Sequence, residues 1–379
     1  SGRRSATPPT RPARPPGASR NLVLAYVHIP FCHSICHYCS FYKHTPGATR
    51  IAGFVAAVLA EAQARAATLP APPRTLYLGG GTPGSMDLDA LAAVLQAIPG
   101  RPWREATLEA APGAITPRQA PACARLSITR ASLGVQRFVD AQLRRTGRRH
   151  TAAAVAADVQ LLRHTGIHEI NLDLIAGLPG QTHDTWRESL HWIERLSPPH
   201  VSVYMLEVDE DSRLGSELLQ GGLRFGAPDV PSEDAIAEFY EQAVEQLTAQ
   251  GIPRYEISNF ARPGHESVHN LKYWRLEPYA GFGADAHSFD GALRRQNADE
   301  IKKYVELCRI QGTGLVKTNP FRPQEERLFL GLRLMEGIEL TPAELARHHA
   351  AITRFVTEGL LEQQDRRLRL TPRGVMLSN

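Results

Sequence analysis

The amino-acid sequence predicts an α/β protein built on a partial (β/α)6 barrel of the TIM type, followed by a small, mostly helical, winged-helix-like domain. From residue 21 to about residue 235, short apolar runs alternate with amphipathic stretches, which is the pattern of parallel βαβ units. Beyond that point the pattern changes to helices with a closing apolar-polar stretch. A chain of 379 residues is long enough to bury a barrel core and a second, smaller core.

Six segments are predicted to form the parallel strands, because each is apolar and bounded by Gly, Pro or polar turn residues. They are 22–29, 75–78, 106–109, 130–135, 169–175 and 200–206. The stretches between them have the length and the amphipathic pattern of crossover helices. The clearest of these helices are predicted at 51–67, 88–97, 152–164 and 183–196.

Three further parts surround the barrel, which we assign to residues 21–235. Residues 1–20 are rich in Pro and Arg and have no hydrophobic period, so we expect a disordered tail. Residues 236–300 carry most of a helix predicted at 234–250 and then a loop-rich segment with the motif His269-Asn270-x2-Tyr273-Trp274. Residues 301–379 are predicted to form the final domain. Its predicted elements are helices at 324–335, 342–349 and 352–359 and a strand-like stretch at 368–371.

The composition predicts a soluble, cytoplasmic protein with at most peripheral membrane association. Hydrophobic residues make up 42% of the chain, and no apolar run approaches the roughly 18 residues that a membrane helix needs. The net charge is only +4 and the final helices lack a concentrated basic face, so nucleic acid is not an expected partner. Three of the five cysteines lie within eight residues, which favours a metal centre in a reducing compartment. The other two, Cys123 and Cys308, are predicted to be buried apolar residues.

The clustered cysteines, Cys32, Cys36 and Cys39, lie on one short loop after the first predicted strand. Three thiolates are one fewer than the four that usually hold a 4Fe-4S cluster, so one iron has no protein ligand. The amino and carboxylate groups of S-adenosylmethionine (SAM) can chelate such an iron, so the spacing predicts a cluster that binds SAM. The alternative is a zinc site completed by a nearby histidine, although this spacing is not a usual zinc pattern. The candidate histidines are His28, His33, His37 and His44.

Several motifs together resemble a known family. The segment from Tyr26 to Cys39 resembles the opening motif of the radical SAM family that includes oxygen-independent coproporphyrinogen III oxidase. The resemblance covers nearly everything after residue 21, and its further motifs lie at 79–83, 132–138, 171–180 and 255–260. Where the oxidase usually has a fourth cysteine this chain has Phe41, which together with the motif at His269 points to the HemW branch of the family.

That branch is regarded as a group of heme chaperones. The resemblance therefore implies a 4Fe-4S cluster, SAM and heme as cofactors, and delivery of heme to apo-proteins of the respiratory chain. It also implies a low-potential electron donor such as flavodoxin or ferredoxin, and it leaves open whether SAM is cleaved. The alternative is an enzyme, oxygen-independent coproporphyrinogen III dehydrogenase, which converts propionate to vinyl groups and yields protoporphyrinogen IX. Phe41 makes that activity the less expected of the two.

The resemblance also implies which residues contact SAM. Gly80, Gly81 and Thr82 match a turn that binds the methionine amino group, although a purely structural turn is the alternative. Glu109 and Asp173 match carboxylates that receive the ribose hydroxyls.

Four more positions match SAM contacts of the family: Tyr26, Tyr38, Gln136 and Arg148. An arginine at the position of Arg148 can pair with the SAM carboxylate, but Arg148 also lies in an Arg-rich run that is typical of a solvated face. Tyr26 and Tyr38 flank the cysteine loop, where an aromatic ring packs on adenine or fills the core.

His269 is the candidate heme contact. An imidazole is a common axial ligand of heme iron, and the aromatic rings of Tyr273 and Trp274 are suited to lie against a porphyrin. The alternative is a structural histidine in a polar loop.

Overall fold

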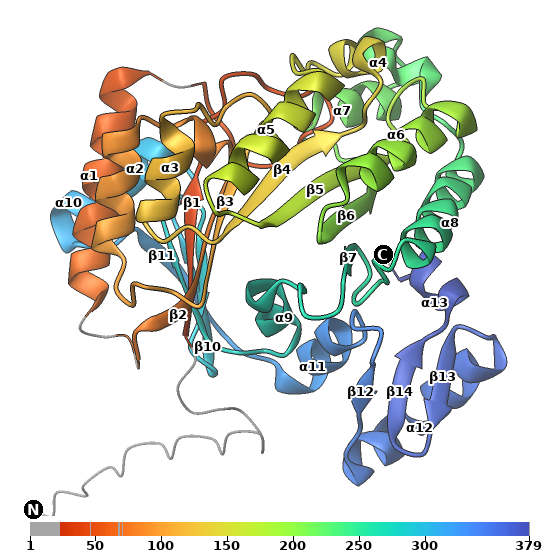
Figure 1. Ribbon diagram of the computed structural model, residues 1–379. Helices are drawn as coiled ribbons and strands as arrows, with labels where there is room; N and C mark the ends of the chain where they lie inside the picture. Colours follow the sequence, from red (N-terminus) through yellow and green to blue (C-terminus); the bar gives the residue numbers. More distant parts are fainter. Residues whose placement is uncertain (1–22, 46, 67–68, 70, 379) are drawn as a thin grey trace, which may run out of the picture.

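The computed structural model of the protein describes residues 23–45, 47–66, 69 and 71–378, so the tail predicted at 1–20 lies outside the described residues. All six predicted barrel strands are confirmed, and neighbouring strands pair in parallel in the order of the chain (Figure 1). They are β1 (Val23–Ile29), β2 (Pro73–Gly80), β3 (Glu105–Ala110), β4 (Arg130–Gln136), β5 (Glu169–Ala176) and β6 (His200–Met205).

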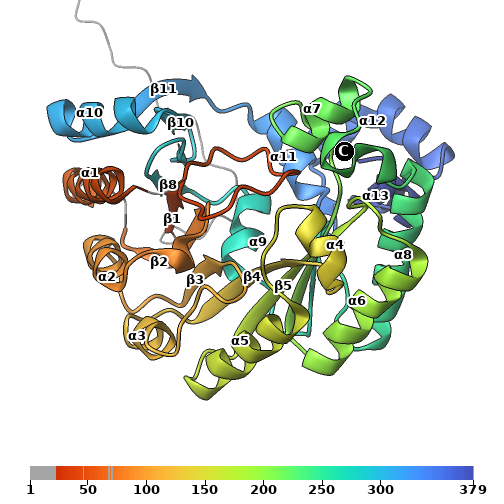
Figure 2. The same ribbon diagram turned by 90° about the horizontal axis from the view of Figure 1, so that it is seen from above.

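Helices cover the outer face of this curved sheet, as the view from above shows (Figure 2). They are α1 (Ala48–Ala66), α2 (Leu88–Ala97), α3 (Gln119–Arg125), α5 (Ala152–His164), α6 (His183–Leu196) and α8 (Glu233–Ala249). Two shorter helices, α4 (Asp140–Arg145) and α7 (Arg213–Leu219), lie near the carboxyl ends of the strands. The long helices agree with the predicted stretches, whereas the three short ones, α3, α4 and α7, were not predicted.

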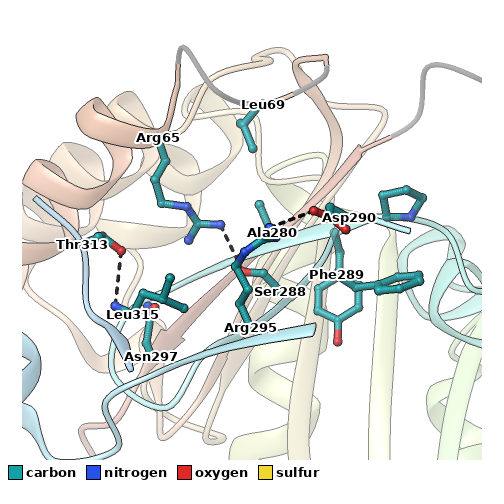
Figure 3. Close-up of a pocket in the computed structure, with 12 residues that line it drawn as sticks. Arg65, Leu69, Ala280, Ser288, Phe289, Asp290, Arg295, Asn297, Thr313 and Leu315 are labelled. Atoms are coloured by element: carbon teal, nitrogen blue, oxygen red, sulfur yellow. Dashed lines mark hydrogen bonds and ion pairs between the residues drawn. The ribbon is translucent and has the colours of Figure 1, made fainter. Parts of the chain in front are cut away.

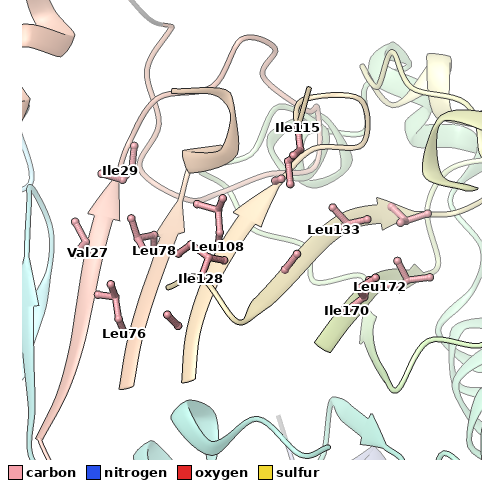
Figure 4. Packing of buried hydrophobic residues seen from close by; sticks show 14 of the residues in the cluster. Val27, Ile29, Leu76, Leu78, Leu108, Ile115, Ile128, Leu133, Ile170 and Leu172 are labelled. Carbon is pink, nitrogen blue, oxygen red and sulfur yellow. The ribbon is translucent and has the colours of Figure 1, made fainter. Parts of the chain in front are cut away.

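The two faces of the strands differ in character because successive side chains alternate. Leu76, Leu108 and Leu133, which Figure 4 labels, are fully buried in the hydrophobic core. Burial of each such leucine contributes about 1.5–3 kcal/mol to folding. The alternate residues are mostly polar and face the barrel interior, among them Thr75 and Glu109. The interior of this barrel is therefore suited to bind polar groups.

The sheet extends beyond the barrel on both sides and has eleven strands in all among the described residues. The added strands are β7 (Asn259–Ala261), β8 (Tyr279–Phe282), β9 (His287–Phe289), β10 (Leu293–Asn297) and β11 (Leu315–Pro320). β7 is antiparallel to β6, and β8 is parallel to β1. The sequence indicated only loops at 251–300, because strands of three to five residues carry too little periodicity to be recognised.

The segment 301–320 also adjoins the large sheet. Helix α10 (Ile301–Gln311) packs beside α1, and β11 pairs with β10. The large sheet therefore continues past residue 300, where we expected the final domain to begin.

The small sheet of the C-terminal region has the order β12-β14-β13. Its elements are α11 (Pro323–Gly331), β12 (Ile338–Glu339), α12 (Pro342–Thr357), β13 (Leu361–Gln364), β14 (Arg367–Leu370) and α13 (Pro372–Met376). The two helices predicted at 342–359 are a single helix, α12, because Ala350 and Ala351 at the predicted break favour a continuous helix. A helix followed by a hairpin agrees with the winged-helix-like arrangement that we predicted.

Among the described residues, no helix combines the length and the apolar character that crossing a bilayer requires.

Candidate cofactor site at the carboxyl end of the barrel

The cysteine loop leaves the end of β1 and is tied by its backbone to the end of β2. Gly81 donates its N–H to the carbonyl of Ile29 at 2.8 Å, and Thr82 donates to the carbonyl of Phe31 at 2.8 Å. The Thr82 hydroxyl also lies 3.5 Å from the Cys32 sulfur. The glycine-rich turn and the first cysteine are therefore parts of one assembly.

The far side of the loop is held by segments from later in the chain. His37 donates its backbone N–H to the carbonyl of Thr146, just after α4, at 3.2 Å. Leu214, in α7, donates to the carbonyl of His37 at 2.8 Å, and the Ser34 hydroxyl donates to the carbonyl of Gly147 at 3.0 Å. The loop is thus fixed from three directions before any cofactor binds.

The three clustered cysteines form no disulfide and are partly exposed, so their sulfurs are available to a cluster. Burial raises the pKa of the Cys39 thiol, and the charges of Lys43 and Arg148 act in the opposite direction. A zinc ion needs ligands that converge on one point, about 2.3 Å from each sulfur. No group of three or more such ligands converges in this way in the part of the chain that the structure describes. In a 4Fe-4S cluster each thiolate binds a different iron, so three thiolates on one loop are a donor set that a cluster can use.

The glycines of the turn are required by close contacts. A Cβ on Gly81 would lie 2.6 Å from the carbonyl oxygen of Phe31, and one on Gly80 would lie 2.7 Å from the His28 ring. Gly80 also has a φ of 105°, in the region that favours glycine. These contacts support the structural role of the turn, and they bring its backbone beside the cysteine loop.

Glu109 lies near the end of β3, with its carboxylate at the level of the glycine turn. It accepts a 2.7 Å hydrogen bond from the Tyr77 hydroxyl and a 3.1 Å hydrogen bond from the N–H of Gly80. Burial raises the pKa of Glu109 to about 7; the hydrogen bonds from Tyr77 and Gly80 oppose this increase and the nearby Asp173 carboxylate adds to it. Tyr77 was not among the predicted site residues. It could have been found, because it precedes Gly79 by two residues and so faces the same side of β2.

Gln136 ends β4 in a strained conformation. Its φ is 69°, which is uncommon for a residue other than glycine, and its buried side-chain oxygen has no hydrogen-bond partner. An orphan acceptor at a strained position is typical of a site completed by a ligand.

Arg148 is directed into the site, since its Nε atom donates to the Tyr38 hydroxyl at 3.0 Å. Its guanidinium nitrogens also lie close to Gly134 on β4, so it does not belong to a solvated face.

Asp173 and Tyr26 complete the upper part of the barrel interior. Asp173 accepts hydrogen bonds from Ser132 at 3.0 Å and Asn171 at 2.7 Å, and burial raises its pKa although these bonds oppose the increase. The Tyr26 hydroxyl lies 3.1 Å from Nδ1 of His28. All the residues predicted to contact SAM therefore lie at one end of the barrel.

His269 lies at the opposite end. It is in the short helix α9 (Val268–Trp274), which lies below the barrel in Figure 1 and inside the arc of strands in Figure 2. Its Nδ1 atom is 2.9 Å from the Thr75 hydroxyl, and its Nε2 atom is 3.0 Å from the Tyr273 hydroxyl. The residue is fully buried, and burial lowers its pKa to about 3. As placed, His269 offers no free ring nitrogen to heme iron and does not fit an axial ligand.

The helix that carries His269 is held by a partly buried ionic network at the amino ends of the strands. Glu105, at the start of β3, accepts hydrogen bonds from the N–H groups of Val268 and His269 at 3.0 and 2.8 Å. Arg130 lies 3.4 Å from Glu105 and 3.2 Å from Glu169. We refer to Glu105, Arg130, Glu169 and α9 as the barrel floor.

A cavity of about 370 Å³ lies elsewhere, between α1 and the added strands β8 to β11 (Figure 3). Its charged groups are engaged with protein atoms: Arg65 donates to the Ser288 hydroxyl at 3.1 Å, and Arg295 pairs with Asp290 at 2.9 Å. No predicted site residue lines it.

Cys123 and Cys308 are buried, as predicted.

A partial barrel with a three-cysteine loop at the carboxyl ends of its strands defines a radical SAM protein. The chain matches the family described as the Radical SAM superfamily over residues 26–193, and the HemN C-terminal domain over residues 324–377. Membership of this superfamily implies a 4Fe-4S cluster and SAM as cofactors.

Similarity to individual proteins shows which family within this superfamily the chain belongs to. Two relatives named "Heme chaperone HemW", from Lactococcus lactis and Bacillus subtilis, are each 33% identical over 94% of this chain, and the matches span 95% and 97% of the relatives. Coproporphyrinogen III oxidase (HemN) from Escherichia coli has the same fold, with a TM-score of 0.83 over 95% of this chain and 88% of its own, at 22% identity. The chain belongs to the HemW family.

Proposed function

We propose that this protein is a heme chaperone that binds heme and transfers it to apo-proteins. The observation that carries the proposal is the likeness to the HemW relatives, which extends over nearly the whole length of both chains. Phe41 supports the same choice, because it stands where the decarboxylating oxidase usually has a fourth cysteine.

The proposed cofactor site is the carboxyl end of the barrel. Cys32, Cys36 and Cys39 hold the cluster, which supplies an iron for SAM and one electron at low potential when bound. The backbone of Gly80 and Gly81, with Thr82, receives the methionine amino group. These roles are supported by the contacts that tie the glycine turn to the cysteine loop.

Charged and polar side chains then orient the nucleoside. Glu109 and Asp173 accept the ribose hydroxyls, and Arg148 pairs with the SAM carboxylate. The orphan oxygen of Gln136 supports its role as a further ligand contact. Tyr26 and Tyr38 pack near the adenine.

The partners and the compartment are part of the same proposal. We infer respiratory-chain apo-proteins as recipients and a flavodoxin or ferredoxin as electron donor. All five cysteines are free thiols, which supports a cytoplasmic location.

The test separates a chaperone from an oxidase. Anaerobically reconstituted protein is mixed with heme, and the Soret band is followed before and after addition of a heme-free respiratory cytochrome. We expect a shifted Soret band that is replaced by that of the holo-cytochrome. In parallel, the protein is incubated with SAM, a reductant and coproporphyrinogen III. Formation of protoporphyrinogen IX, or no change of the heme spectrum, would reject the proposal.

A further inference from the structure

Among the described residues of the site, Glu109 is the one carboxylate that accepts a hydrogen bond from a tyrosine hydroxyl. The Tyr77 hydroxyl donates to one oxygen of Glu109 at 2.7 Å, and the N–H of Gly80 donates to the other at 3.1 Å. Both bonds are made by β2, so the orientation of the carboxylate depends on how the Tyr77 ring is held.

The Tyr77 ring lies between the barrel floor and the cofactor site at the carboxyl ends of the strands, which we call the mouth and which includes the cysteine loop, the glycine turn, Glu109, Gln136 and Asp173. Its centroid lies 6.2 Å from that of Tyr26 on β1 and 5.3 Å from that of His269 in α9. His269 is fixed in turn by its hydrogen bonds to Thr75 and Tyr273. A continuous set of contacts therefore leads from α9 to Glu109.

We propose that Tyr77, supported from below by His269, is a positioning residue that holds Glu109 in the orientation and the ionised state needed to bind SAM. This inference rests on the proposed contact between Glu109 and the SAM ribose. It assigns the His269 motif to the support of the SAM site, in place of the heme contact predicted from the sequence.

The chemistry of the pair predicts a pH dependence. A hydroxyl that donates to a carboxylate stabilises the ionised form, and burial beside Asp173 destabilises it. Three more titratable groups lie around Glu109: Tyr26 on β1, Tyr77 itself and Tyr204 on β6. Burial raises the pKa of all three tyrosines, so they stay neutral and uncharged near pH 7. SAM binding is therefore expected to strengthen as the pH rises through about 7, where Glu109 ionises.

The test measures the dissociation constant of SAM by equilibrium dialysis between pH 5.5 and 9, on anaerobically reconstituted protein. In Tyr77→Phe the ionised form of Glu109 loses one hydrogen bond, so the midpoint of the pH profile should rise by about one unit. At the highest pH the variant should bind SAM within about two-fold of the unmodified protein, because Glu109 is then ionised in both. A variant that is merely damaged would bind more weakly at every pH.

The chain contains a matched control. The Tyr304 hydroxyl donates to the buried carboxylate of Glu61 at 2.8 Å, between α10 and α1. Tyr304→Phe removes the same group from the same kind of bond and should leave the SAM profile unchanged. Glu109→Gln should remove the part of the pH dependence that Glu109 contributes, and Asp173 and the SAM amino group account for what remains.

Three outcomes would overturn the inference: an unshifted profile in Tyr77→Phe, a loss of affinity in Tyr77→Phe that is equal at every pH, or an equal shift in Tyr304→Phe. If Glu109→Gln binds SAM with unchanged affinity at every pH, the contact between Glu109 and SAM fails, and this inference fails with it. None of these results bears on heme transfer, which is tested separately.

The role of His269 is checked with His269→Asn, which should weaken SAM binding and leave the heme spectrum unaltered. Unchanged SAM binding together with an altered heme spectrum would instead support His269 as a heme contact.

Discussion

Strand β3 carries two inward-facing glutamates, Glu105 at its start and Glu109 near its end, and their surroundings are opposite in kind. Glu105 faces a cation, Arg130, and receives the N–H groups at the start of α9. Glu109 faces another carboxylate, Asp173, and has only the Tyr77 hydroxyl and one backbone N–H. Glu105 and Glu109 are only four positions apart on one strand, yet the surroundings of Glu105 stabilise its charge and those of Glu109 destabilise its charge.

The different surroundings of Glu105 and Glu109 indicate that the two ends of the barrel have different roles. The floor uses opposite charges and a helix terminus to close the amino ends of the strands. The mouth holds like charges, the strained backbone of Gln136 and an orphan acceptor, which are favourable only when a ligand supplies the missing partners. Substitutions at the mouth should therefore act on cofactor binding, and substitutions at the floor on stability.

The largest expected effect is at the mouth. Replacement of Cys32, Cys36 or Cys39 by Ser should abolish the 4Fe-4S cluster, because two thiolates cannot hold it firmly. Iron and sulfide quantitation after anaerobic reconstitution measures the loss, and electron paramagnetic resonance with and without SAM follows the open iron. Cys123→Ser is the control, since this buried cysteine lies in α3 and should leave the iron content unchanged. Normal iron loading in all three loop variants would disprove the cluster assignment.

The sequence was sufficient to predict that the cysteine loop and the glycine turn follow neighbouring strands, but not Tyr77 or the barrel floor. The cysteine spacing and the glycine turn are local signals, and each follows a strand whose alternation is readable on its own. The floor depends on Glu105 and His269, which are 164 residues apart and give no sign in the sequence of their contact. His269 was predicted as a heme contact because an imidazole is a common axial ligand of heme iron and the rings of Tyr273 and Trp274 are suited to lie against a porphyrin. Only its burial, with both ring nitrogens bonded, points to a supporting role.

The second effect is at the floor. Arg130→Met should lower the free energy of unfolding by about 3–5 kcal/mol, because it leaves Glu105 buried without its cation. Glu169 is about one-third exposed and keeps its contact with His265, so it adds less to the loss. Urea unfolding at pH 8 measures this loss of stability.

Glu109→Gln is the corresponding substitution at the mouth. The carboxylate has a folded pKa of about 7 against an ordinary value of 4.5, so the folded state gains protons between these values. Stability from this group is therefore lost as the pH rises from 4.5 to 7, by up to about 3 kcal/mol.

The glutamine variant should consequently be at least as stable as the unmodified protein at pH 8, and its advantage should shrink towards pH 5. A large destabilisation by Glu109→Gln together with a negligible effect of Arg130→Met would reverse the assignment of the two ends.

The smallest effect compares two glycine-to-alanine changes that are expected to act in opposite directions. In Gly81→Ala the new Cβ would lie 2.6 Å from the Phe31 carbonyl oxygen and 2.8 Å from that of Ile29, both backbone atoms that cannot turn away. We expect a loss of about 1–3 kcal/mol and weaker SAM binding, because the turn and the cysteine loop must separate. Gly53 lies inside α1, and a Cβ there would have nothing within 4 Å beyond its chain neighbours and the backbone of its own helix, so Gly53→Ala should stabilise the protein by about 0.5–1 kcal/mol. Urea unfolding and equilibrium dialysis with SAM are measured on both variants. If Gly81→Ala lowers neither the free energy of unfolding nor the affinity for SAM, the close packing of the turn against the cysteine loop has no part in holding the cofactor.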